Sequence, residues 1–159
     1  MHTIRNTAFG HTVTDLPMEN VPVFEKKLFS MVTPEVDLHL KDLGRTHFVL
    51  FGIEGHVCVQ QTCLDLLEKG HDVHVIVDGV SSGKSLDREV ALRRMEMAGA
   101  YLTTSQSIIF ALLGSASHPK FKEISKLIVE HGKKVNEFDT ERTSETAAVG
   151  NKLEVTGRS

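Results

Sequence analysis

Apolar runs alternate with segments of helical spacing along this chain, which is the pattern of parallel strands joined by crossover helices. Residues Phe48 to Phe51 form a continuous apolar run, so a strand buried on both faces is predicted there. His74–Asp78 and the shorter Ala100–Thr103 predict two further strands. We therefore expect an α/β fold, with a parallel sheet and helices on both of its faces.

Helices are predicted from apolar spacing and from the residues that start and stop them. The first helix is predicted to begin at Thr33-Pro34 and the last at His118-Pro119. Between them, three helices are predicted: one from Cys58 to Gly70, one from Ser85 to Gly99, and one from Ser105 or Ser107 to Leu113. A threonine followed by proline is typical of a helix start, because the hydroxyl caps a free N–H group and proline fits the first turn.

The two ends of the chain lack this regular pattern. Residues 1–20 are predicted to form a loop, and Val21–Phe24 a short extended piece in which Pro22 disfavours a central strand. From Lys133 onward, Thr, Glu, Lys and Asn predominate and there is little to bury. We therefore expect one domain over residues 1–131 and a disordered polar tail over residues 132–159.

Composition points away from two classes of partner. A net charge of −3 over 159 residues gives no basis for nucleic-acid binding, and no apolar run is long enough to cross a bilayer. With only two cysteines and no apolar signal segment in Met1–Thr14, a cytoplasmic location is expected, with a mitochondrial or peroxisomal pool left open. The nine histidines show no zinc-binding spacing, so neither a metal nor a cofactor is expected.

Cys58 is the candidate for chemistry because it lies at a predicted strand-to-helix turn, just after Gly52 and Gly55. Ligands of open α/β sheets bind at this end of the strands. A helix N-terminus also favours thiolate over thiol. Position alone leaves two interpretations open, a nucleophile or a small apolar core residue, and the second is what we expect for Cys63.

Several separated motifs resemble one family. Gly52–Val59 (GIEGHVCV) is similar to the nucleophile segment of the isochorismatase-like cysteine hydrolases, and Glu25–Met31 (EKKLFSM) is similar to a second signature of that family. Further similarities, some of them specific to its animal and protozoan branch, lie at Val77-Asp78, Ser81-Ser82, Asp87-Arg88, Thr103–Ser105 and His118–Ile124. The chain resembles the family over roughly residues 8–128.

The resemblance implies a mechanism and a topology. Cys58 would attack a carbonyl carbon to form a thioester, and Lys26 would support the thiolate, although by position alone it is as ordinary as its neighbour Lys27. A cis peptide bond at Ile53–Glu54 would turn the N–H groups of Glu54 and Cys58 toward one oxyanion. No cofactor is implied. The implied fold is a Rossmann-like three-layer sandwich with strand order 3-2-1-4-5-6.

The family's catalytic triad includes an aspartate at the end of the family's first strand. This aspartate has no counterpart in the chain. Asp15 lies in a predicted loop, and Asp78 matches a family position that we interpret as structural. The chain thus resembles the family without its N-terminal βαβ segment, either as an incomplete form of an active enzyme or as a genuine short chain. Without the first strand, Phe48–Phe51 is an open edge that favours self-association, so a homo-oligomer is expected.

Two functions follow from these observations. The first is a cysteine hydrolase that acts on a small-molecule substrate, an amide or related carbonyl compound. The alternative is a catalytically impaired short form that acts as an interaction or oligomerisation module. A third and weaker hypothesis makes Cys58 a redox-sensing thiol.

Overall fold

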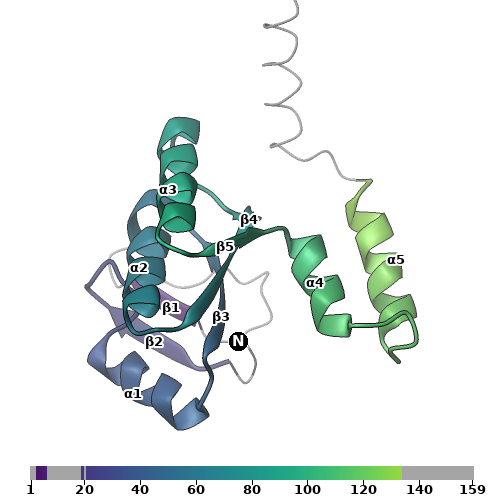
Figure 1. Cartoon of the computed structure of the whole chain (residues 1–159), viewed down its shortest axis with the longest axis horizontal. Coiled ribbons are helices and arrows are strands. Elements are labelled where there is room, and N and C mark those ends of the chain that lie inside the picture. Colours follow the sequence, from purple (N-terminus) through teal and green to yellow (C-terminus); the bar gives the residue numbers. More distant parts are fainter. Residues whose placement is uncertain (1–2, 7–18, 20, 134–159) are drawn as a thin grey trace, which may run out of the picture. The chain divides into compact units, whose positions relative to one another are not determined.

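The computed structural model of the chain describes residues 3–6, 19 and 21–133 (Figure 1). Its elements are β1 (Thr3–Asn6), β2 (Val23–Lys26), α1 (Pro34–Leu43), β3 (His47–Gly52), the π-helical turn η2 (Gly55–Val59), α2 (Gln60–Glu68), β4 (Asp72–Val80), α3 (Ser85–Met97), β5 (Tyr101–Thr103), α4 (Ser105–Leu113) and α5 (Phe121–His131). They fall into two compact units, Met1–Ser105 and Gln106–Ser159. Most of the predicted polar tail, residues 134–159, lies outside the described residues.

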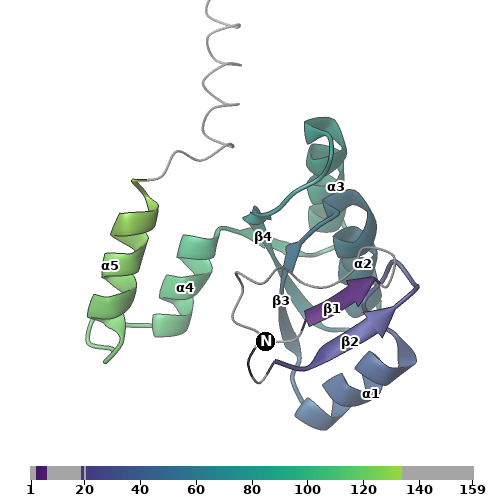
Figure 2. The ribbon, with the colours of Figure 1, turned by 180° about the vertical axis from the view of Figure 1, so that it is seen from behind.

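The strands of the first unit pair in parallel, as predicted. They form a two-stranded sheet, β1-β2, and a three-stranded sheet in the order β3-β4-β5. Figure 2 shows β1 and β2 side by side. β4 is central, and β3 therefore has one edge with which no strand of the described residues pairs. The α/β class with a parallel sheet is confirmed.

The core lies between the three-stranded sheet and helices α2 and α3, which Figure 1 shows on the same side of that sheet. Val73 and Val75 of β4 are completely buried, as are Cys63 of α2 and Met95 of α3. Burying one such valine side chain contributes about 1.5–3 kcal/mol. The core thus anchors β4 and α2, the two elements that flank the end of β3.

The starts of α1 and α4 agree with the sequence signals, whereas α2 begins at Gln60 after the π-helical turn that contains Cys58, and α5 begins at Phe121 rather than at His118-Pro119. The Thr33 hydroxyl accepts a hydrogen bond from the Val36 N–H at 3.3 Å, and Pro34 occupies the first turn of α1. Gly44 and Gly70 follow α1 and α2 with φ of 59° and 81°, a left-handed conformation that glycine adopts at little cost. The third helix begins at Ser85, as predicted, but the further expectation that Ser85 caps it is wrong: Ser85 is the first residue of α3, and Lys84 precedes it without a side-chain cap.

Two strand predictions are wrong. Residues 3–6 form the strand β1 rather than a loop, because they pair with β2 and gain backbone hydrogen bonds there. The sequence of a four-residue segment does not show whether a partner strand will lie beside it. β3 is not buried on both faces: Phe48 and Leu50 pack against the core, whereas Val49 is 41% and Phe51 56% exposed. The apolar run indicated a strand but not which of its faces would be covered.

The second unit is described by α4 and α5. Gly114 ends α4 with φ of 68°, and the rings of Phe110 and Phe121 lie 6.3 Å apart between the two helices. The spacing of α5 predicted one apolar side made of Phe121, Ile124, Leu127 and Ile128. Phe121, Ile124 and Ile128 are partly buried, whereas Leu127 is 58% exposed. Among the described residues, no helix combines the length and the apolar character needed to span a bilayer.

Candidate active site

Cys58 lies where β3 passes into the helical segment of η2 and α2. β3 ends at Gly52, and the peptide bond between Ile53 and Glu54 is cis, at the position where the resemblance implied one. The turn η2 then carries Cys58, which is half-buried, two residues before α2 begins. π-Helical turns are rare overall, but those that occur often lie at functional sites. They widen one turn of the helix and so redirect its side chains.

Lys26 is the cation that the structure brings to this sulfur. It ends β2 and is only 5% exposed, whereas its neighbour Lys27 is exposed. Its ammonium group donates hydrogen bonds to the carbonyls of Leu28 at 2.8 Å and Phe29 at 2.7 Å, and its Nζ lies 3.5 Å from Cys58 Sγ. Two residues 32 positions apart in the sequence, both predicted for the site, thus lie in contact.

Thr62 supports this pair and was not found from the sequence. It is 2% exposed, its hydroxyl donates to the Cys58 carbonyl at 2.6 Å, and it accepts from the Met31 N–H at 2.9 Å. One buried hydroxyl therefore links the backbone of Cys58 to the EKKLFSM segment, which supplies the carbonyls that hold Lys26. Its only sequence signal is the spacing of four residues from Cys58, which places it one helical turn later.

The backbone between β3 and Cys58 packs directly against the loop after β4. The Gly55 N–H donates to the Ser81 carbonyl at 2.8 Å, and the Ser81 N–H donates to the Gly52 carbonyl at 3.4 Å. A Cβ atom built at Gly55 would lie 2.7 Å from Val80 Cγ1, closer than real side-chain contacts allow. Glycine is therefore required at this position for the two loops to approach each other.

Side chains strengthen the same contact. His56 Nδ1 lies 3.0 Å from Ser82 Oγ and 3.8 Å from Glu54 Oε2. The Glu54 carboxylate accepts a hydrogen bond from the Gly83 N–H at 2.9 Å. The sequence motif GIEGHVCV thus contributes Glu54 and His56 to loop positioning, and both residues remain partly exposed beside the candidate nucleophile.

Cys63 lies in the core, where it was expected. It is 0% exposed, and burial raises the pKa of its thiol to about 11, because the thiolate would lose its hydration. The Cys63 side chain is therefore an uncharged thiol at neutral pH. It serves as an internal reference for the reactivity of Cys58.

Of the two aspartates considered as substitutes for the family's base, the structure describes Asp78. Asp78 accepts hydrogen bonds from the Ser105 N–H at 2.7 Å and the Ser105 hydroxyl at 2.5 Å, which caps the start of α4. Asp15 lies outside the described residues. Within the described part of the chain, no group of three or more His, Cys, Asp and Glu side chains is arranged to hold a metal ion.

Comparison with known proteins finds relatives of known family. The isochorismatase domain matches residues 3–107. The secreted isochorismatase effector Isc1 of Phytophthora sojae is 51% identical over 82% of this chain and 66% of its own length. Isochorismatase domain-containing protein 2 of Xenopus laevis is 48% identical over 76% of this chain and 60% of its own length. The chain thus spans less than two thirds of the length of these relatives.

A solved structure supports the same relationship. The protein described as MAR1 ribonuclease of Caenorhabditis elegans is 47% identical and superposes with a TM-score of 0.74, over 80% of this chain and 68% of the nematode chain. The α/β architecture of this chain is therefore shared with a solved relative.

Proposed function

This chain belongs to the isochorismatase family, and from that premise we propose that it hydrolyses a small amide or related carbonyl compound through Cys58. Family membership supports a hydrolase-type function. The observation that carries the proposal is the 3.5 Å separation between Lys26 Nζ and Cys58 Sγ. A fixed ammonium group at this distance stabilises a thiolate, which is the nucleophilic form of cysteine.

The proposed reaction has two covalent steps. The Cys58 thiolate attacks the carbonyl carbon and forms a C–S bond; the C–N bond then breaks, and the leaving amine takes a proton from solvent. Water next attacks the thioester and the C–S bond breaks, which releases the carboxylic acid, restores the thiolate and returns one proton to solvent. Negative charge develops on the carbonyl oxygen in each step, and we assign its stabilisation to the N–H groups of Glu54 and Cys58.

The loop after β4 supports this assignment by positioning. Its contacts with Gly55, Glu54 and His56 fix the segment that carries both proposed N–H donors. Donors that are already oriented stabilise an oxyanion without any cost of reorganisation during the reaction.

A thioester trapped on Cys58 is the direct test. With p-nitrophenyl acetate as the probe, we expect release of nitrophenolate and, after rapid acid quench, one acetyl group on the peptide that contains Cys58. The Cys58→Ala variant should lose both signals. The Cys63→Ala variant should keep the acetyl group on Cys58, because Cys63 is sealed in the core. Acetylation of Cys63 or of lysines, with none on Cys58, contradicts the proposal.

The same assay separates the other candidate functions. An impaired interaction module predicts no acetyl group on Cys58 in the folded chain. Ribonuclease activity, the function in the description of the nematode relative, would be detected as Cys58-independent cleavage of a labelled RNA oligonucleotide. The net charge of −3 offers little attraction for an RNA backbone, so a small-molecule substrate is favoured here.

We also propose that the chain acts in the cytoplasm. Both of its cysteines are free thiols, which suits a reducing compartment. The relative from Phytophthora sojae is described as secreted, and that description applies to that protein. The location of a tagged full-length chain, measured by fractionation, tests the proposal.

A further inference from the structure

The Asp87-Arg88 motif is a part of the family resemblance that has no role in the candidate site so far. Arg88 is the fourth residue of α3, a helix that contributes to the core. Its Nε donates a hydrogen bond to the Val80 carbonyl at 2.8 Å, and its Nη2 donates to the Val77 carbonyl. One guanidinium group therefore holds two backbone carbonyls that are three residues apart on β4.

These two carbonyls lie at an irregularity in the pairing of β3 with β4. Leu50 pairs with Val75 and Gly52 pairs with Val80, so two positions along β3 correspond to five positions along β4. The regular ladder is interrupted there, and backbone groups at such an interruption need other partners. Arg88 supplies a partner for two of them and ties the end of β4 to α3.

The loop that begins at Val80 contacts the segment of the candidate nucleophile through four consecutive residues. The contacts are Val80 with Gly55, Ser81 with Gly52 and Gly55, Ser82 with His56, and Gly83 with Glu54. Arg88 holds the first of these four residues by its carbonyl. All of these contacts lie within residues 52–88, which the structure describes throughout.

We propose that Arg88 is a positioning residue for the backbone that binds the oxyanion. It fixes the start of the loop after β4, and that loop fixes the N–H groups of Glu54 and Cys58; this deepens the proposed function and rests on it. Arginine suits the task because its planar group donates in two fixed directions, whereas lysine has a single rotating ammonium. A cation near the N-terminal end of a helix is disfavoured by the helix dipole, so the two carbonyls, rather than α3 itself, account for a cation at this position.

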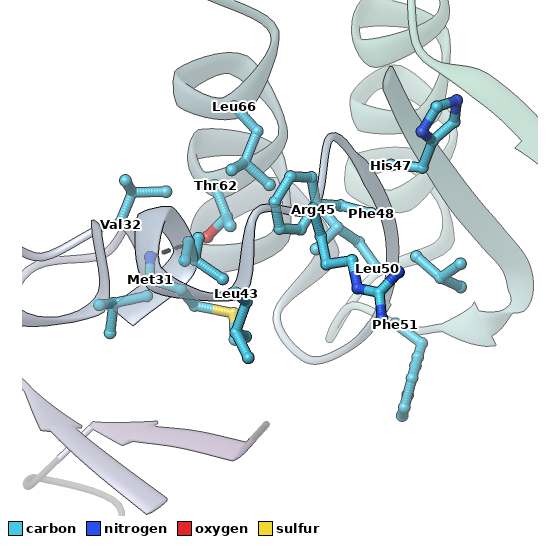
Figure 3. Close-up of a pocket in the computed structure, with 13 residues that line it drawn as sticks. Met31, Val32, Leu43, Arg45, His47, Phe48, Leu50, Phe51, Thr62 and Leu66 are labelled. Atoms are coloured by element: carbon cyan, nitrogen blue, oxygen red, sulfur yellow. Dashed lines mark hydrogen bonds between the residues drawn. The ribbon is translucent and has the colours of Figure 1, made fainter. Parts of the chain in front are cut away.

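The sulfur of Cys58 is held by other elements. Thr62 donates to the Cys58 carbonyl and accepts from the Met31 N–H; Figure 3 shows the second of these bonds, in the wall of an apolar pocket. Lys26 reaches Sγ from the end of β2. None of these three contacts involves the loop after β4. A change at Arg88 should therefore impair the oxyanion donors and spare the thiolate.

Two reagents separate these two effects. p-Nitrophenyl acetate acetylates a thiolate through a tetrahedral oxyanion, whereas iodoacetamide alkylates it by displacement at a saturated carbon and forms no such oxyanion. Arg88→Met should lower the acetylation rate of Cys58 by about tenfold or more and change its alkylation rate by less than about twofold, both followed by peptide mass spectrometry at pH 7. Arg93→Met is the matched control, because Arg93 is an exposed arginine on the same helix, and it should change neither rate.

Arg88→Lys separates the geometry of the side chain from its charge. R88K keeps a cation but not the two fixed donors, so its acetylation rate should lie between those of wild type and R88M, with alkylation again unchanged. It also carries the test if circular dichroism shows that R88M does not fold.

Three results would count against this role of Arg88. Acetylation at the wild-type rate in either variant overturns it, and so does a parallel fall of both rates, which would indicate general disruption of the site. A wild-type chain that is alkylated but never acetylated on Cys58 contradicts the proposed function itself, and the role of Arg88 with it.

Discussion

Replacing Lys26 with methionine is expected to slow alkylation of Cys58 by iodoacetamide at pH 7 by at least tenfold. Tenfold in rate corresponds to about 1.4 kcal/mol. The physical reason is that the ammonium group 3.5 Å from the sulfur is the charge that stabilises the thiolate, and methionine keeps the volume while removing the charge. Mass spectrometry of the Cys58 peptide after timed quenching measures the rate.

Lys27→Met is the matched control, because Lys27 is adjacent in sequence but exposed. It should leave the rate unchanged. K26M also leaves the carbonyls of Leu28 and Phe29 without their Lys26 donor, which lowers the stability of the folded chain. Thermal unfolding must therefore accompany the labelling. A folded K26M chain that reacts as fast as wild type would show that Lys26 does not activate Cys58.

Gly55→Ala is expected to have the second large effect, on both stability and reactivity. The added Cβ would lie 2.7 Å from Val80 Cγ1 and 3.3 Å from the Ser81 carbonyl, so the loop after β4 must move away. Overpacking of this kind typically costs about 1–3 kcal/mol. Because that loop holds Glu54 and His56, we also expect loss of most thioester formation on Cys58, measured with p-nitrophenyl acetate.

Gly83→Ala serves as the control for this substitution. Gly83 lies in the same loop, but a Cβ atom there would meet no heavy atom within 4 Å. It should therefore change neither the unfolding temperature nor the activity by a measurable amount. If G55A and G83A behave alike, the tight contact at Gly55 has no part in positioning the nucleophile segment.

The elements were largely predictable because their signals are local. The Thr33-Pro34 start of α1 and the glycine stop after α2 depend only on neighbouring residues, and the structure has them at those positions. β1 was missed because a four-residue strand gains its stability from pairing with β2. The exposed face of β3 was missed because an apolar run carries no information about whether another element covers it.

The candidate site was predictable only in part. Cys58 and Lys26 lie in recognisable motifs, and the structure brings them together. Thr62 was not found, since a lone threonine has no distinctive pattern, and its role arises from contact with Met31, 31 residues away. The Ser81-Ser82 motif was recognised, but not the contact of Ser82 with His56, 26 residues away. Such contacts depend on the tertiary fold rather than on local spacing.

The ratio of alkylation rates of the two cysteines in the native wild-type chain tests the central claim most directly. Burial raises the pKa of Cys63 to about 11, so its thiol stays protonated and enclosed at pH 7, while Cys58 is half-buried beside Lys26. Labelled with iodoacetamide at pH 7 and followed by peptide mass spectrometry, Cys58 should react at least a hundredfold faster, a difference of about 2.7 kcal/mol. Equal rates, or no reaction at Cys58 until the chain unfolds, would contradict an activated nucleophile at this position.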